Sequence, residues 1–210
     1  MVFVFYIIVG IFSLAIIISL VYFLSPRLSP IPYFPSNWKD VPAIVATILE
    51  NGDLRLENSE KHTIIDLGAG TGTVIFPATL EAYRRGLKTT FVAVEVNPFL
   101  VFIMHLRRLF HPHRKAINIV RADMFNIDRN YILKSLCQSA DPNLNTIYLY
   151  VGNLEDTKVK KMLSQFPTGT KVVSYMYKIP GWEKRLKTTK SGQHSIYVYQ
   201  LGLRISLGSR

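Results

Sequence analysis

Hydrophobic positions form one uninterrupted block at the start of the chain and shorter, regularly spaced groups after it. Val2 to Leu24 contains no charged side chain and no proline, and it exceeds the roughly 20 apolar residues that a helix needs to cross a bilayer core. A basic n-region is absent, and the stretch is too long for a cleaved signal peptide. The block predicts a transmembrane anchor over residues 1–24, with a buried core helix as the alternative.

The segment after the anchor changes character abruptly. Four prolines between residues 25 and 35 predict a stiff, extended connector. Apolar residues then recur at helical spacing between Trp38 and Asn51, so a helix is expected there. We therefore divide the chain into an anchor at 1–24, a connector with an N-terminal helix at 25–60, and a main domain at 61–210.

In the main domain, short apolar runs alternate with amphipathic segments. Such alternation predicts βαβ units, and hence an α/β fold with a Rossmann-like, mostly parallel sheet and flanking helices. The last strand follows a loop rich in glycine and lysine, which favours an antiparallel direction for that strand. We expect strands over 63–67, 89–96, 116–120, 145–151, 171–177 and 195–203, and helices over 74–85, 97–111 and 157–165.

The sequence Asp66 to Gly72, DLGAGTG, joins the first expected strand to its helix. Glycines at this place permit a tight turn and a close approach of the backbone to a ligand. Thr73 stands where a dinucleotide-binding motif has its third glycine, which disfavours pyrophosphate binding and an oxidoreductase. A Gly-rich turn that binds nothing is the alternative.

Two acidic residues follow at the ends of the next two strands. Glu95 can accept hydrogen bonds from two ribose hydroxyls, because a carboxylate is purely an acceptor. Asn97 is expected to cap the following helix, with Pro98 in its first turn. Asp123 can accept a bond from an adenine amino group with Met124 or Phe125 against the ring, or it is a solvated turn residue.

These motifs, in this order, resemble class I S-adenosylmethionine-dependent methyltransferases. More narrowly, the chain is similar to the small membrane-anchored protein-lysine methyltransferases typified by the mitochondrial enzymes that modify ATP synthase c-subunit and the adenine nucleotide translocase. The matching pieces are the anchor, Pro32 to Ser36, Asp66 to Gly72, Glu95 to Pro98, and Ile179 to Trp182. The resemblance implies S-adenosylmethionine as cofactor. The expected cofactor-binding residues are Asp66, Gly68, Ala69, Gly70, Gly72, Glu95, Asn97, Asp123 and Met124.

The acceptor side of the site is less well marked. An apolar, aromatic mouth would favour the neutral form of a lysine amine, and Tyr33, Phe34 and Trp38 are candidates to line it. Asn153, after the fourth strand, is a candidate to orient the amine, and no general base is identified. The expected activity is methylation of a lysine on a membrane-associated protein. RNA or a small molecule is the alternative acceptor, and a non-catalytic scaffold is a more distant one.

The charge of the chain bears on its partners. The formal net charge is +11, and residues 1–26 carry no charged side chain. A basic domain attracts anionic lipid headgroups or nucleic acid, and the anchor makes lipid the simpler expectation. Arg27 and Lys39 follow the anchor and no charged side chain precedes it, so the positive-inside rule predicts that the domain is on the cytoplasmic or matrix-equivalent side. The spacing of His105, His111 and His113 fits no standard metal site, so no metal is expected.

Overall fold

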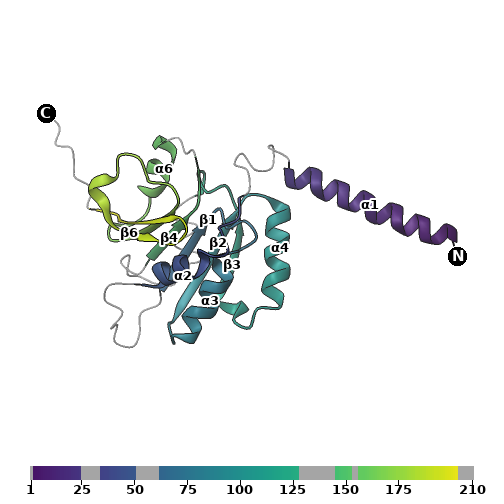
Figure 1. Ribbon diagram of the computed structural model, residues 1–210, viewed down its shortest axis with the longest axis horizontal. Helices are drawn as coiled ribbons and strands as arrows, with labels where there is room; N and C mark the ends of the chain where they lie inside the picture. The colour runs from purple at the N-terminus through teal and green to yellow at the C-terminus, as the bar shows by residue number, and fades with distance from the viewer. Residues whose placement is uncertain (1, 25–33, 51–61, 128–144, 153–155, 203–210) are drawn as a thin grey trace.

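A twisted, mixed β-sheet carries the main domain. The computed structural model describes residues 2–24, 34–50, 62–127, 145–152 and 156–202 (Figure 1). Over these residues the sheet has seven strands in the order β3-β2-β1-β4-β5-β7-β6. The strands are β1 (His62–Leu67), β2 (Thr89–Glu95), β3 (Ile117–Arg121), β4 (Asn145–Leu149), β5 (Lys171–Tyr175), β6 (Leu186–Ser191) and β7 (Ser195–Gln200).

Helices cover both faces of this sheet. The helices are α1 (Val2–Leu24), α2 (Val41–Leu49), α3 (Ile75–Arg84), α4 (Pro98–Leu109) and α6 (Asp156–Leu163), with short 3-10 turns at Arg114–Ala116 and Glu183–Arg185. One core cluster joins α2, α3 and α4 to side chains such as Ile64. A second cluster joins α6 to Ile65 and Leu67 on the opposite face. Because both faces are covered, β1 is buried along its whole length.

The pairing of strands agrees with the sequence pattern except at one edge. Strands β1 to β5 pair in parallel, and β7 pairs antiparallel with β5, as expected. Strand β6, with the sequence LKTTKS, forms where the pattern predicts only a loop. Among the described strands it pairs with β7 alone, at the edge of the sheet, so most of its side chains face solvent and no apolar pattern marks it.

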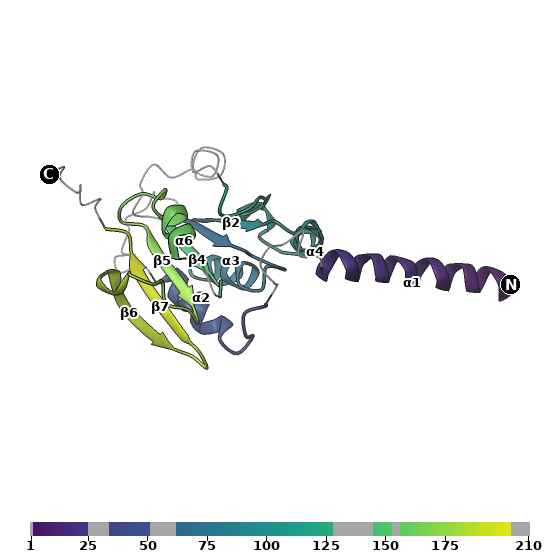
Figure 2. The ribbon, with the colours of Figure 1, turned by 90° about the horizontal axis from the view of Figure 1, so that it is seen from above.

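The N-terminal helix α1 forms over the expected residues. Its described side chains, from Val2 to Ile18, are all exposed, and the helix contacts α4 (Figures 1 and 2). Within the described part of the chain, no helix has both the length and the apolar character needed to traverse a membrane. The transmembrane anchor expected at residues 1–24 is not supported by that finding and stays a prediction.

Lys171 ties the end of α2 to the sheet. Its Nζ donates hydrogen bonds to the carbonyl oxygens of Thr47 and Glu50 at the end of the helix. The last carbonyls of a helix have no partner within it, so a lysine satisfies them and complements the helix dipole. Burial of the amine lowers the pKa of Lys171 to about 8.

Candidate cofactor and acceptor site

The Gly-rich loop at the carboxyl end of β1 is held by backbone hydrogen bonds to β2. The amides of Gly68 and Ala69 both donate to the carbonyl of Val94, each at 2.9 Å. Gly72 N donates to Ala69 O at 2.8 Å, which closes the turn. All three glycines of the motif, including Gly70, have positive φ, a region that other residues rarely adopt. The loop is therefore built from the glycines that the sequence identified.

Gly72 has a second reason to be glycine. A Cβ atom at this position would lie 2.4 Å from the ring of Phe76, in the first turn of α3. Gly68 differs, because the nearest atom to its Cβ position is Met124 Sδ at 3.9 Å. Gly72 thus serves helix packing, whereas the backbone at Gly68 can be approached by a ligand.

Glu95, at the end of β2, connects the loop to the start of α4. Its Oε2 accepts from Gly70 N at 2.9 Å, and its Oε1 accepts from the amides of Val96 and Asn97, both at 2.9 Å. A carboxylate offers about four acceptor positions, so these bonds leave about one for a ligand hydroxyl. Glu95 is buried, and its bonds fix the loop against β2. The sequence predicted its location but not this use of its oxygens.

Asn97 caps α4, as the sequence predicted. Its Oδ1 accepts from Phe99 N at 2.9 Å, and Pro98 occupies the first turn. Its Nδ2 is buried without a hydrogen-bond partner. A buried donor left unsatisfied is unfavourable by about 1–3 kcal/mol. An acceptor oxygen of a ligand bound beside Glu95 would relieve it.

Asp66 lies beneath the loop, where it is almost fully buried. It pairs in register with Tyr148 of β4, whose hydroxyl lies 2.9 Å from the Ser36 hydroxyl. Burial, and secondarily the negative charge of Glu95, raises the pKa of Asp66 to about 8. Asp66 is therefore largely protonated at neutral pH.

Asp123 and Met124 follow β3 at the same edge of the sheet. Asp123 Oδ1 accepts from Phe125 N at 3.0 Å, and Oδ2 accepts from the side-chain amide of Asn126 at 2.6 Å. The carboxylate thus closes a turn, which is the alternative that the sequence left open. Met124 is buried and lies toward Gly68. Asp123, Met124, Glu95 and the glycine loop thus all lie at the carboxyl ends of the parallel strands β1, β2 and β3.

Arg107 is a contact to the loop that sequence reasoning missed. Its guanidinium donates to Thr71 O at 2.6 Å and stacks over the ring of Phe76 at 4.6 Å. The interaction joins the last turn of α4 to the loop before α3. Two residues 36 positions apart in the sequence carry no local signal for it.

Aromatic side chains dominate the carboxyl edge of β4 and β5. Tyr150 stacks on Tyr177 with ring centroids 6.1 Å apart, and it meets Tyr175 edge-on at 4.9 Å. Met176, between Tyr175 and Tyr177 in the sequence, has a φ of 65°, which is strained for a residue with a side chain. A Cβ on Gly152 would lie 3.0 Å from the Tyr177 hydroxyl. The glycine at 152 thus leaves room for the Tyr177 ring, and the left-handed backbone at Met176 directs the chain into Tyr177.

A buried hydrogen-bond network lies behind these rings. Asp40, just before α2, accepts from Tyr175 Oη at 2.7 Å, and its Oδ2 lies 2.8 Å from Nδ1 of His194. The amide of Gln193 also donates to Asp40, at 2.5 Å. Burial opposes ionisation of Asp40, but the hydrogen bonds from Tyr175, His194 and the backbone outweigh it and lower its pKa. The network clamps the start of α2 to the β6–β7 turn.

The candidates for the acceptor side of the site fall into two groups. Tyr33 and Asn153 lie outside the described residues. Phe34 and Trp38 are both exposed, and Trp38 is 75% accessible beneath Lys39. Their rings face solvent in this structure and do not line a mouth, whereas the Ser36 hydroxyl of the same segment lies 2.9 Å from the Tyr148 hydroxyl.

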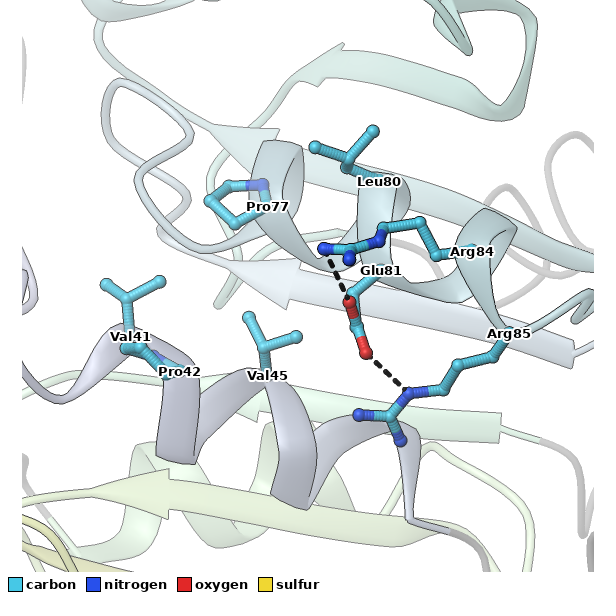
Figure 3. A pocket seen from close by; sticks show the side chains of 8 residues that line it. All are labelled: Val41, Pro42, Val45, Pro77, Leu80, Glu81, Arg84 and Arg85. Atoms are coloured by element: carbon cyan, nitrogen blue, oxygen red, sulfur yellow. Dashed lines mark hydrogen bonds and ion pairs between the residues drawn. The ribbon is translucent and has the colours of Figure 1, made fainter.

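Among the described residues, no three His, Cys, Asp or Glu side chains are grouped so as to hold a metal ion. A groove of about 420 Å³ runs between α2 and α3 (Figure 3). On the α3 side of the groove, Glu81 forms ion pairs with Arg84 and Arg85. Its lining is Val41, Pro42, Val45, Pro77, Leu80, Glu81, Arg84 and Arg85, and none of the expected cofactor residues is among them.

Known structures share this fold. No protein-family model and no curated protein matches the chain. An RNA methyltransferase from Salinibacter ruber, solved with S-adenosylhomocysteine, aligns with a TM-score of 0.61 at 18% identity over 82% of this chain and 96% of that one. The glycopeptide N-methyltransferase MtfA, solved with S-adenosylmethionine, aligns with a TM-score of 0.46 at 14% identity over 81% and 68%. The first likeness shows that this chain has the fold of a class I methyltransferase.

Proposed function

We propose that the chain is an S-adenosylmethionine-dependent methyltransferase that modifies a lysine side chain of a membrane-associated protein. The observation that carries the proposal is the hydrogen bond between Gly70 N and Glu95 Oε2. It brings the glycine loop of β1 and the acid of β2 together beside the point where strand order reverses, between β1 and β4. Ligands of open α/β sheets bind at such a point.

The described residues fit this cofactor. Gly68 leaves its backbone open, Glu95 keeps about one acceptor position, and Asn97 holds an unsatisfied buried donor. When bound, S-adenosylmethionine supplies a methyl group on a positively charged sulfur, and the acceptor nitrogen forms a C–N bond as the C–S bond breaks and then loses a proton to solvent. The loop, Glu95 and Asn97 would hold the nucleoside part. The contribution of the protein is chiefly positioning.

The aromatic rings after β4 and β5 support a lysine acceptor. Tyr150 follows β4, which is the neighbour of β1 in the sheet order, and Tyr177 follows β5, which is the next strand along. Aromatic faces attract a lysine ammonium and so can draw the side chain to this edge. Partial burial has the opposite effect on charge and favours the neutral form that attacks the methyl group.

The location is part of the proposal. Helix α1 is apolar and exposed along its described length, as an anchor in a bilayer would be. Arg27 and Lys39 follow it, which favours a cytoplasmic or matrix-equivalent side for the domain. An anchored enzyme meets acceptors in the same membrane at a high effective concentration.

Two measurements test the proposal. Calorimetry with the full chain in detergent should show binding of S-adenosylmethionine and none of NAD. Incubation with labelled S-adenosylmethionine and a membrane extract should then give label that protease removes and nuclease does not, with mass spectrometry locating it on lysine. Binding without any transfer would indicate a scaffold instead of an enzyme.

A second candidate is methylation of RNA. The net charge of +11 favours a polyanionic partner, and the Salinibacter ruber protein of the same fold is an RNA methyltransferase. In that case nuclease, and not protease, would remove the label from the extract.

A further inference from the structure

The outward face of α4 is apolar although nothing described covers it fully. Phe102, Leu106, Leu109 and Phe110 are spaced as one helical stripe, and all four are exposed, Phe110 to 88%. The opposite side of the helix packs into the core through Leu100, Val101 and Met104. A surface helix normally turns a polar face to water. We therefore expect a partner to cover this outer stripe.

The surroundings of this stripe are basic. From Pro98 to Ala116 the chain has four Lys or Arg residues and no acidic one. Arg107 and Arg108 lie in the last turn of α4, and Arg114 and Lys115 form the 3-10 turn that follows. A stripe of large apolar side chains with a basic surround is the composition that binds the interface of an anionic bilayer.

The arrangement of helices supports the same partner. Helix α1 contacts α4, and in both views α4 is the part of the domain next to the end of α1 (Figures 1 and 2). In Figure 1, α4 runs across the direction of α1. If α1 enters a bilayer, α4 lies along the surface of that bilayer. Its exposed stripe is then a continuation of the apolar surface of α1.

We propose that the outer face of α4, comprising Phe102, Leu106, Leu109 and Phe110 with the exposed basic residues Arg114 and Lys115 of the turn that follows, is a docking surface for an anionic lipid bilayer. Docking would fix the orientation of the sheet relative to the membrane, and with it the edge that carries the glycine loop. The inference concerns membrane contact by the main domain and holds whatever the domain methylates.

Leu106 and Leu80 provide a matched test, because they are 43% and 42% exposed on neighbouring helices. Leu80 borders the groove between α2 and α3 and lies off the α4 stripe. The full chain is reconstituted into vesicles of phosphatidylcholine with phosphatidylglycerol, made with brominated acyl chains that quench tryptophan on contact. Leu106→Trp should add emission that the brominated lipid quenches, and Leu80→Trp should add emission that it does not. The native Trp38 and Trp182 set the background.

Charge is tested separately with Lys115→Gln and, as its control, the exposed Lys187→Gln of β6. One basic residue near an anionic surface contributes about 1 kcal/mol, so the first change should lower the ratio of docked to undocked protein about fivefold. Lys187→Gln should leave it unchanged. Circular dichroism and cofactor calorimetry on each variant check that it is folded.

Three outcomes would overturn the inference. Equal quenching of the added emission in Leu106→Trp and Leu80→Trp would show that the α4 stripe does not select the bilayer. Quenching of Leu106→Trp that is the same in pure phosphatidylcholine would remove the role of charge. In detergent, emission of Leu106→Trp that shifts with protein concentration would identify a second copy of the chain as the occupant. Failure to bind S-adenosylmethionine would contradict the proposed methyltransferase activity and would not affect the quenching results on membrane docking.

Discussion

The glycine loop and the tyrosine cluster, which form the two ends of the candidate site, are stabilised by different kinds of contact. Around Gly68 and Gly70, backbone amides donate to Val94 and Glu95, so the cofactor end depends on main-chain geometry. Around Tyr150 and Tyr177, the contacts are between side chains from separate segments. A main-chain site tolerates few substitutions at its glycines, whereas a side-chain site can change specificity one residue at a time. The difference favours a constant cofactor end and an adaptable acceptor end.

The largest effect should come from Gly72→Ala. The new Cβ would overlap the Phe76 ring in addition to the strain of a positive φ. Overpacking of this kind typically amounts to about 1–3 kcal/mol beyond the backbone term. Gly86→Ala is the control, because Gly86 has a similar φ of 71° and open space around its Cβ position. Cofactor affinity and the free energy of unfolding should fall clearly further for Gly72→Ala, and equal losses would show that Phe76 yields freely.

Asp66→Asn should change how stability depends on pH. The folded-state pKa of Asp66, about 8, lies above its ordinary value of 3.8, so between these values the folded protein holds a proton that the unfolded chain has lost. The stability of the wild-type protein should therefore decline as pH rises from 3.8 toward 8. Asparagine cannot ionise, so the variant should lack this part of the decline. Melting temperatures of both proteins across that range, without cofactor, make the comparison, and parallel curves would contradict the raised pKa.

Asp40→Asn should destabilise the network behind the tyrosine cluster and leave the glycine loop unaffected. It places an amide group where donors from Tyr175, His194 and Gln193 converge, and an unsatisfied buried group costs about 1–3 kcal/mol of stability. Affinity for S-adenosylmethionine should stay near that of the wild type. Glu183→Gln is the control, since Glu183 is an exposed carboxylate that accepts a bond from Gly181 N. Weaker cofactor binding in Asp40→Asn would mean that the two ends are coupled.

Tyr177→Leu should give the smallest change. A cation–π contact at an exposed site contributes about 0.5–1 kcal/mol, so transfer to a lysine acceptor should slow about two- to fivefold. Tyr177 is 41% exposed, so folding should be little affected. Tyr83→Leu is the matched change, because Tyr83 is exposed and stacks on His113 near the end of α3. Equal rates for the two variants would remove Tyr177 from the acceptor site.

The sequence predicted what local patterns encode. Strand β1, the glycine turn after it and the cap at Asn97 each depend on residues within a few positions of one another, and all three form as expected. Strand β6 escaped prediction because an edge strand lacks an apolar face. The bond from Arg107 to Thr71 and the clamp around Asp40 escaped it because they join segments that only the folded sheet brings together.

The edge strand β6 has a consequence for how the chain behaves in a crowded compartment. An exposed strand offers unpaired amide and carbonyl groups to any other extended chain, which is a common start of aggregation. Lys187 and Lys190 lie on β6, and the pairing with β7 is irregular between Leu186 and Thr188. Charged side chains and an uneven ladder both discourage the addition of another strand. The polar sequence that concealed β6 thus keeps the sheet from growing beyond its last strand.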